Sequence, residues 1–281
     1  MSSAKRIGIV GFGSLGQFLF EQAKSKPELL VVAFVWNRTP DALRGVDESL
    51  VLHDLSRVRE HAVDLIVEVA HPSITERFGA AFLEHADYFC GSPTAFADEA
   101  TERSVRAAVA QFRHSLYVPA GALWGANDIA KMAQRGTLRS LRISMAKHPA
   151  SLKLDGELAL KLAEAAKVTD RAVVLYDGPV RALCPLAPNN VNTMACAAMA
   201  GLGFDRTQAL LISDARLQSH DIEIDLEGPV NKDTGQPFRC VTKRINPAAV
   251  GAVTGSATYV SFFSSLLDAV AFARHGGVHF V

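Results

Sequence analysis

The sequence lacks a long apolar run, a paired-cysteine motif and a metal-binding motif. No apolar stretch in its 281 residues approaches the about 20 that span a bilayer, and residues 1–4 are too short and polar for a secretory signal. The four cysteines form no C-x-x-C pair, and no HExxH motif or histidine–cysteine cluster has metal-ligand spacing. We therefore predict a cytoplasmic protein with reduced thiols, no metal and no membrane contact.

Excess charge of either sign is also missing. Lysine plus arginine and aspartate plus glutamate each number 29, so the formal net charge is zero. This balance argues against binding to nucleic acid or to an anionic membrane surface. Hydrophobic residues make up 49% and charged residues 21%, a composition typical of a globular chain with a sizeable core.

A glycine-rich turn near the start is the most informative feature present. An apolar, β-branched run at residues 6–10 predicts a buried strand, and G-x-G-x-x-G follows directly. Gly11 permits a tight turn, Gly13 lets the backbone approach a pyrophosphate, and Gly16 lets strand and helix pack closely. The amphipathic run after it predicts a helix whose first N–H groups, around Ser14 and Leu15, face the anion. We predict a dinucleotide-binding loop; the alternative is a glycine turn that binds nothing.

The rest of the first half alternates strand and helix patterns. Strands are predicted at residues 29–36, 64–70, 88–90 and 115–119, and helices at 73–84 and 101–112. The helix at 73–84 is expected to open with a capping box at Ser73. This order predicts a Rossmann-type, doubly wound parallel sheet. Ligands bind at the carboxyl ends of such strands, where Ala70 and Ser92 join the glycine loop as candidate cofactor contacts.

The end of the second strand bears on which dinucleotide is bound. An acidic residue there binds the ribose 2′-hydroxyl of NAD, whereas an arginine accommodates the 2′-phosphate of NADP. The strand ends in Asn37, Arg38 and Thr39, with no carboxylate. We predict a site for NADP or NAD that favours NADP, with Asn37 and Arg38 as contacts. The alternative is a solvated Arg38 and indifference to the phosphate.

The second half changes character. Helices are predicted at residues 126–135, 158–166 and 190–202, and strands, several of them alternating, at 138–147, 172–176, 210–213, 220–226 and 239–243. Alternation predicts a sheet with one open face, within a second α+β domain. We therefore expect a dinucleotide-binding domain at 1–120, a substrate domain at 121–255, and a C-terminal segment at 256–281 whose helix packs back on the body.

His220 stands out among nine histidines by its phase in a strand. It continues the face formed by Ile222, Ile224 and Leu226. A histidine there is commonly a satisfied core residue. At the mouth of a strand, however, a half-desolvated imidazole with a pKa near ~6.5 is suited to proton transfer.

Several stretches in order along nearly the whole chain resemble the L-aspartate dehydrogenase family. They are GFGSLG at 11–16, AGALWG at 120–125, APNNVNTMACAAMAGLGFD at 187–205, SHDIEI at 219–224 and NPAAVGAVTGSATYVSF at 246–262. The resemblance implies oxidative deamination of L-aspartate to oxaloacetate and ammonia with NAD or NADP, in a homodimer. It also implies that His220 is the catalytic acid/base and that Ala122 and Asn190 contact the cofactor.

Two carboxylates on the substrate call for converging cations. Lys147, His148, Lys243 and Arg244 lie at ends of predicted strands and are candidates, although each alone is more commonly a solvated charge. The family commonly has Lys-Pro-Pro where this chain has Lys147-His148-Pro149. Asn192 is a further candidate substrate contact. Together with Asn190 it lies at a predicted helix start, where its side chain can cap the helix or its backbone can hold a polar ligand.

Two other functions remain compatible with the sequence. A dinucleotide domain with an open-sheet partner also fits dehydrogenases or reductases of other amino acids or of amino-acid semialdehydes. A non-catalytic NADP-binding sensor would have the same glycine loop without turnover.

Overall fold

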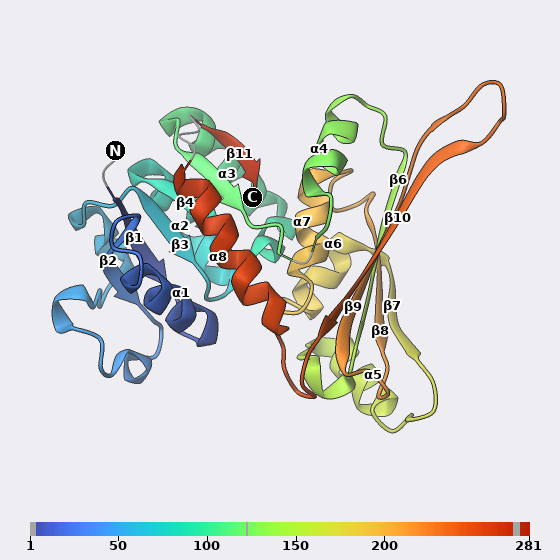
Figure 1. Cartoon of the computed structure of the whole chain (residues 1–281), viewed down its shortest axis with the longest axis horizontal. Helices are drawn as coiled ribbons and strands as arrows, with labels where there is room; N and C mark the ends of the chain where they lie inside the picture. Colours follow the sequence, from blue (N-terminus) through green and yellow to red (C-terminus); the bar gives the residue numbers. More distant parts are fainter. Residues whose placement is uncertain (1–3, 122, 272–275) are drawn as a thin grey trace. The chain divides into compact units, whose positions relative to one another are not determined.

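The computed structural model describes residues 4–121, 123–271 and 276–281 (Figure 1). The chain divides into two compact units. The first contains residues 1–119 and 262–281, and the second contains residues 120–261. Each unit is built on one sheet of its own. No helix in the described parts of the chain is long and apolar enough to cross a membrane.

The first unit is a doubly wound parallel sheet, as the sequence predicts. Its strands follow the order β11-β5-β4-β3-β1-β2, and every described pair is parallel. The strands are β1 Lys5–Val10, β2 Leu30–Trp36, β3 Leu65–Glu68, β4 Asp87–Cys90, β5 Ser115–Val118 and β11 Gly277–Phe280. The helices are α1 Ser14–Lys24, α2 Pro72–His85, α3 Glu99–Phe112 and α8 Ser256–Ala271, with 3₁₀ turns η1 Pro40–Leu43, η2 Glu48–Leu50, η3 Leu55–Glu60 and η4 Pro93–Ala97.

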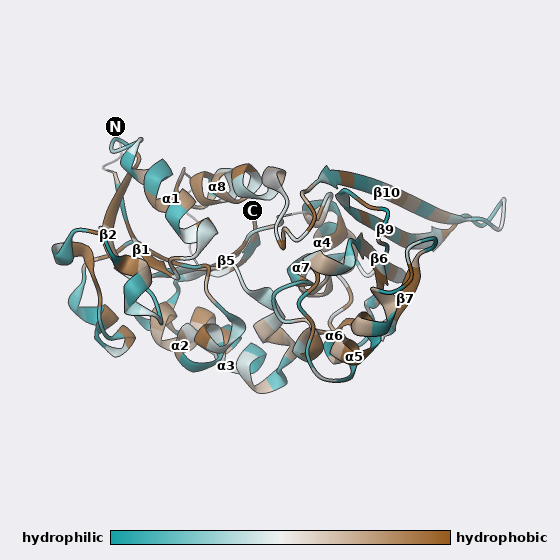
Figure 2. Cartoon of the chain, turned by 90° about the horizontal axis from the view of Figure 1, so that it is seen from below, coloured by the Kyte–Doolittle hydropathy of each residue, from teal (hydrophilic) through white to brown (hydrophobic). Residues whose placement is uncertain are grey.

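Helices cover both faces of this sheet, which explains why its central strands are apolar throughout. Both views place α1 and α8 on one face and α2 and α3 on the other (Figures 1 and 2). Ile7 and Ile9 of β1 are fully buried, and Phe262, Phe263 and Leu266 of α8 join the same core cluster. The end of α8 thus supplies core for the dinucleotide-type sheet, far from it in sequence.

Two local details differ from the sequence-based expectations. The capping box at Ser73 is wrong, because the N-cap of α2 is His71, two residues earlier. The His71 ring Nδ1 accepts the Ser73 N–H at 3.2 Å, and Pro72 takes the first helical position. The strand β11 was not expected at all. Its four residues pair with β5 and lack a long apolar pattern of their own.

The second unit is a five-stranded mixed sheet in the order β10-β9-β6-β8-β7. Its strands are β6 Ser140–Lys147, β7 Val173–Pro179, β8 Gln208–Ser213, β9 Ser219–Val230 and β10 Pro237–Pro247. Its helices are α4 Ala126–Gln134, α5 Gly156–Ala165, α6 Val180–Leu183 and α7 Asn192–Ala200, with 3₁₀ turns η5 Pro149–Ser151 and η6 Cys184–Leu186.

Only one face of the second sheet is covered by helices of its own unit. Figures 1 and 2 place α4, α6 and α7 on one side of the strands, and Figure 2 shows β10 banded in alternating polar and apolar colours. Burial alternates accordingly along β6 and β9, so that Met145 and Ile222 point inward while Ser144 and Glu223 point outward. We call the helix-covered side the inner face and the other the outer face; the open-faced sheet predicted from the alternation is confirmed.

A buried carboxylate ties together the strand ends of the first unit. Glu68, the last residue of β3, is completely buried. Its Oε1 accepts the Ala70 N–H at 2.7 Å, the His71 N–H at 2.9 Å and the Ser92 hydroxyl at 3.1 Å, and its Oε2 accepts the Ser92 N–H at 3.0 Å. These bonds join the loops that follow β3 and β4. A buried charge is tolerated here because donors surround it.

Glu68 should couple folding to pH. Burial raises its pKa from 4.5 to about 7, although the four hydrogen bonds act in the opposite direction. Between these values the folded state holds more protons than the unfolded state, so the contribution of Glu68 to stability falls as the pH rises. We expect Glu68→Gln, which does not ionise, to gain up to about 3 kcal/mol relative to wild type between about pH 5 and 8. Urea unfolding across this range measures the difference.

The matched control is Glu28→Gln, which changes an exposed glutamate of the same unit. Its difference from wild type should stay constant over the same pH range. A constant difference for Glu68→Gln as well would contradict the titration of the buried carboxyl.

Candidate active site

The glycine loop has the geometry of an anion-binding turn. Gly11 has φ of +108°, and a Cβ on Gly16 would lie 2.0 Å from the Gly11 carbonyl oxygen, so the fold itself requires glycine at both positions. A Cβ on Gly13 would meet nothing within 4 Å. Gly13 and Ser14 are exposed at the start of α1, and no side chain caps this helix. The fold itself therefore does not require glycine at position 13. The open space there leaves room for a ligand beside the N–H groups at the start of α1.

Asn37 and Arg38, the two residues at the end of β2 that were predicted to contact the cofactor, have different roles in the structure. The Asn37 Oδ1 accepts the Phe12 N–H at 2.9 Å, and its Nδ2 donates to the Thr39 carbonyl at 2.9 Å. Asn37 thus uses its amide to hold the glycine loop against β2. Arg38 is exposed, and no hydrogen bond or ion pair in the described parts of the chain holds its guanidinium. Arg38 remains available to a phosphate.

Ala70 packs against the glycine loop, and Ser92 bonds to the buried Glu68 at the ends of the neighbouring strands. A Cβ on Gly11 would lie 2.8 Å from the Ala70 backbone N and from its Cβ, so Ala70 packs directly on the turn. The hydroxyl of Ser92 is donated to Glu68. Leu15 lies half-buried in the first turn of α1. Ala122, which was also predicted to contact the cofactor, lies outside the described residues.

Four polar side chains form a row across the inner face of the second sheet. Asn246 on β10 pairs with His220 on β9, and Lys147 on β6 pairs with Ser213 on β8. Ala146 pairs with Asp221, which sets Lys147 beside His220 in register. All four are buried, with exposed fractions of 5% for Lys147 and His220, 4% for Asn246 and 2% for Ser213. The next row is apolar on β9, β6 and β8, at Ile222, Met145 and Leu211, and carries Arg244 on β10. The four residues therefore form a polar strip at one end of a largely hydrophobic face.

Several atoms of this row have no partner in the described structure. They are Nε2 of His220, Oδ1 of Asn246 and Oγ of Ser213. Lys147 Nζ donates only weakly, to the carbonyls of Asn190 and Val253 at 3.4 Å each, and no acidic side chain of the described residues pairs with it. Buried polar groups are normally hydrogen-bonded, so this strip has the character of a site for a polar, anionic ligand.

Burial and charge shift both titratable groups of the strip. Burial lowers the pKa of Lys147 to about 8, which keeps the ammonium mostly charged at neutral pH. Burial, and then the charge of Lys147, lower the pKa of His220 to about 4, while the nearby Ala252 backbone and Asp221 act the other way. The expected pKa near 6.5 is therefore wrong: His220 is a neutral imidazole at pH 7, ready to accept a proton.

The other predicted substrate contacts are distributed on both faces. His148, next to Lys147, caps η5 by accepting the Ala150 N–H at 3.1 Å. Lys243 lies on the outer face, 3.7 Å from the Asp221 carboxylate, so the structure does not bring it to His220. Arg244 lies on the inner face opposite Ile222, half-buried, and donates to the Gly121 carbonyl at 3.0 Å. It lines a depression of about 520 Å³ together with Trp124 and Ile222.

Asn190 fixes the loop that precedes α7. Its Oδ1 accepts the Lys153 N–H at 2.8 Å and its Nδ2 donates to the Ser151 carbonyl at 3.2 Å. The expectation that it caps the helix is wrong, because Val191 is the N-cap and no side chain caps α7. Asn192 is the first residue of α7. Its role as a substrate contact and that of Asn190 as a cofactor contact stay predictions.

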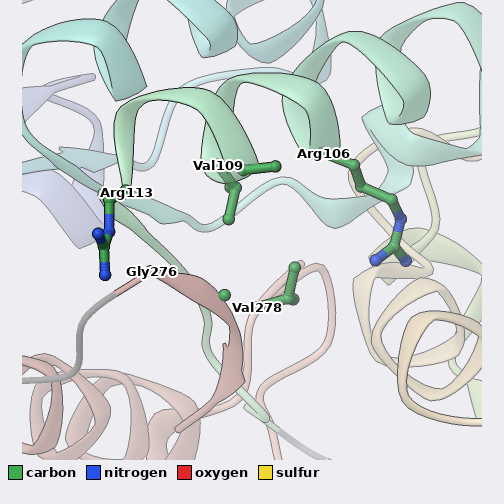
Figure 3. Close-up of a pocket in the computed structure, with 7 residues that line it drawn as sticks. Arg106, Val109, Arg113, Gly276 and Val278 are labelled. Atoms are coloured by element: carbon green, nitrogen blue, oxygen red, sulfur yellow. The ribbon is translucent and has the colours of Figure 1, made fainter.

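A second depression, in the first unit, lies away from the predicted cofactor loop. It measures about 560 Å³ and is lined by Arg106, Val109 and Arg113 of the α3 region and by Gly276 and Val278 (Figure 3). Both strands beside it, β5 and β11, begin there. It is thus at the amino ends of the strands, whereas ligands of doubly wound sheets bind at the carboxyl ends.

Three residues of functional interest were missed from the sequence. Glu68 carried a usable signal, because an acidic residue inside a continuous apolar strand must find buried donors. Asn246 and Ser213 carried none in isolation. Their position depends on which residue of a neighbouring strand lies opposite, and that register is set only by the folded sheet. No group of three or more potential metal ligands occurs among the described residues.

Comparisons with known proteins divide the chain as its two units do. The model "Homoserine dehydrogenase, NAD binding domain" matches residues 11–119, and the model "Aspartate dehydrogenase, C-terminal" matches residues 128–265. An aspartate dehydrogenase domain-containing protein of Xenopus tropicalis is 51% identical over 278 residues, covering 97% of this chain and 96% of that protein. An L-aspartate dehydrogenase of Brucella anthropi is 29% identical over 228 residues, covering 79% and 83% respectively.

A solved structure supports the same fold. The crystal structure of aspartate dehydrogenase from Thermotoga maritima matches with a TM-score of 0.70 at 17% identity, covering 97% of this chain and 99% of that one. The predicted Rossmann-type sheet and second mixed-sheet domain are thereby confirmed, as is the use of NAD or NADP by the first unit. On these grounds the chain belongs to the aspartate dehydrogenase family.

Proposed function

We propose that the protein oxidises L-aspartate to oxaloacetate and ammonia with NADP or NAD, using His220 as the proton acceptor. The observation that carries the proposal is the strip on the second sheet: a buried ammonium with no acidic partner among the described residues, beside a buried, neutral histidine. A small dicarboxylate with an amino group supplies the charges that this strip lacks. A dinucleotide held at the glycine loop of residues 11–16 would supply the acceptor for the hydride that leaves the α-carbon of the substrate.

His220 has two proton transfers to perform in this scheme. Its free Nε2 accepts a proton from the substrate ammonium, so that the nitrogen lone pair can form the C=N bond as the hydride leaves. This proton passes to solvent, which restores the neutral imidazole and accounts for the one proton that the overall reaction releases. His220 then accepts a proton from the water that attacks the imine carbon, and returns it to the nitrogen as ammonia departs. A neutral imidazole at pH 7 is the form that both steps require at their start.

Two cations of the inner face are suited to the two carboxylates. Lys147 is deeply buried beside His220 and takes the α-carboxylate. Arg244 lies one inner-face position along β10 from Asn246, beside the 520 Å³ depression, and takes the side-chain carboxylate. A carboxylate that reaches Lys147 replaces the water lost on burial of its charge.

The test of the proton acceptor is His220→Ala. We expect turnover of aspartate to fall by about 10²–10⁴-fold with little change in NADPH binding, because the variant lacks the base but keeps the glycine loop. Initial rates of NADPH formation and a fluorescence titration of NADPH measure the two effects. In the wild type, the acid limb of kcat/KM should lie below the about 6.5 of a free histidine, following the lowered pKa of His220.

The control is His53→Ala, which removes an exposed histidine of the first unit. It should leave turnover unchanged. Retained turnover in His220→Ala would assign His220 to the core rather than to the reaction. A wild type that binds NADPH but oxidises no amino acid would favour the non-catalytic sensor, and activity on another amino acid or a semialdehyde would replace aspartate as substrate.

We propose further that Arg38 binds the 2′-phosphate of NADP. Its guanidinium is exposed at the end of β2 and has no partner in the described structure. We expect Arg38→Ala to weaken NADPH binding by about tenfold or more, the loss of one charge-assisted contact, and to leave NADH binding unchanged. Titration of both reduced cofactors measures this, with Arg44→Ala, whose arginine pairs with Asp41, as control. Much tighter binding of NADH than of NADPH by the wild type would overturn the assignment.

We also propose that two copies associate through the outer face of the second sheet. Val174, Val241 and Ile245 on this face are 57%, 49% and 61% exposed, and the ion pairs Arg142–Asp177 and Arg239–Asp225 lie among them. A face that combines exposed apolar side chains with charges of both signs suits a two-fold interface. A cytoplasmic location stays a prediction.

Light scattering after size-exclusion chromatography tests the dimer. The wild type should elute at twice the chain mass of 30.2 kDa, and the double variant Val174→Glu/Ile245→Glu at the monomer mass. Leu160→Glu, which changes a 74% exposed leucine of α5 off this face, should remain dimeric. A monomeric wild type at micromolar concentration would refute this interface.

A further inference from the structure

Asn246, like Ser213, is a member of the polar strip that has no role in the scheme above, and it is the one beside His220. It lies on β10 directly opposite His220, is 4% exposed, and its Oδ1 has no hydrogen-bond donor in the described structure. A buried amide oxygen without a donor costs on the order of 1–3 kcal/mol, which a purely structural asparagine would avoid. The group is therefore expected to meet a donor that the described residues do not provide.

The backbone of a neighbouring segment holds this amide in place. A Cβ on Gly255 would lie 2.2 Å from Nδ2 of Asn246, 2.8 Å from its Cγ and 3.1 Å from its Oδ1. Only glycine therefore allows the chain before α8 to pass so close to the amide. Asn246 is thus packed on one side by the Gly255 backbone and has His220 on the next strand.

The order of groups along the strip matches the order of groups on an amino acid. Lys147, His220 and Asn246 follow one another across β6, β9 and β10, giving a cation, a proton acceptor and a hydrogen-bond acceptor. An α-amino acid carries a carboxylate and an ammonium on one carbon. With the carboxylate at Lys147, the nitrogen lies on the far side, where His220 takes one of its protons and another N–H faces Asn246.

We propose that Asn246 binds the α-nitrogen of the substrate through its Oδ1 and makes the site selective for amines over the corresponding hydroxy acids. This inference rests on the oxidation proposed above. The amine gives one proton to His220 and still donates to Asn246, both before and after the C=N bond forms. A 2-hydroxy acid has a single O–H proton, which His220 must take, so that Asn246 is left without a donor as the ketone forms.

The overall reaction balances with this assignment. The amino acid, the oxidised dinucleotide and water give the oxo acid, ammonium, the reduced dinucleotide and one proton. The C–H electron pair leaves as hydride, the nitrogen lone pair forms the C=N bond, and water supplies the oxygen of the product. Asn246 gains and loses no proton, so it is a binding and selectivity residue rather than an acid or base.

The experiment compares kcat/KM for L-aspartate and L-malate in wild type and Asn246→Leu, a variant of similar size without the acceptor. We expect kcat/KM for aspartate to fall by about 10–100-fold, whereas the low value for malate changes little, so that the ratio of the two falls by the same factor. Asn246→Asp, which keeps an acceptor oxygen, should retain most of the preference for the amine. NADPH binding should be unchanged in both variants.

The control is Thr207→Val, a polar-to-apolar change at another buried residue of the same unit, which lies outside the strip and the depression. It should keep the wild-type ratio. An unchanged ratio in a folded Asn246→Leu, or equal losses for aspartate and malate, would overturn the role of Asn246. If Asn246→Leu fails to fold, the same comparison made with Asn246→Ala, which also lacks the acceptor, decides the question.

Failure of the proposed substrate gives a different pattern. A wild type that oxidises another amino acid in place of aspartate contradicts the substrate but leaves Asn246 testable, with that amino acid and its hydroxy analogue as the pair. A wild type that prefers hydroxy acids would overturn both the proposed function and the role of Asn246.

Discussion

The interaction on which the second unit depends is the burial of the Lys147 charge without an acidic partner. Taking an ammonium out of water costs several kcal/mol, and the two carbonyls that face it at 3.4 Å offset only part of that cost. Those carbonyls belong to Asn190 and Val253, on two segments that are far apart in sequence. The loop around Asn190 is in turn fixed through its side-chain amide. The segments that flank the strip are therefore organised around a charge that only an anion would fully satisfy.

The buried polar groups described in the first unit have hydrogen-bond partners, whereas several of those in the strip of the second unit lack them. This contrast distinguishes a structural role from a ligand-binding role. Glu68 is as deeply buried as Lys147, but each of its oxygens accepts bonds from the surrounding loops. It holds the loops at the carboxyl ends of β3 and β4 and needs nothing else. The strip of Lys147, His220 and Asn246 leaves donors and acceptors unused. A satisfied buried group is evidence of architecture, whereas a cluster of unsatisfied ones is evidence of a ligand.

What could be predicted from the sequence follows from how local each feature is. The glycine loop is set by residues adjacent in the chain, so both its turn and the open space at Gly13 were foreseeable. Alternation correctly gave the inner face of His220, because side chains in a strand change face at every residue. The same alternation sets Lys243 and Arg244 on opposite faces of the sheet. Which of these faces the helices cover is decided only in the folded unit, so the sequence could not tell which of the two is on the same face as His220. The strand β11 is defined by its pairing with β5 rather than by a pattern of its own.

The pKa of His220 shows most clearly why composition and phase are insufficient. Its lowering arises first from burial and then from an ammonium on the next strand, and the sequence reveals neither quantity. The coupling also has a chemical consequence. The charge of an unpaired Lys147 adds to the effect of burial in lowering the pKa of His220. A carboxylate bound at Lys147 would offset that charge and make the imidazole more basic. In the proposed reaction the substrate would thus strengthen the base by the same contact that binds it, and His220 would accept a proton most readily with the amino acid in place.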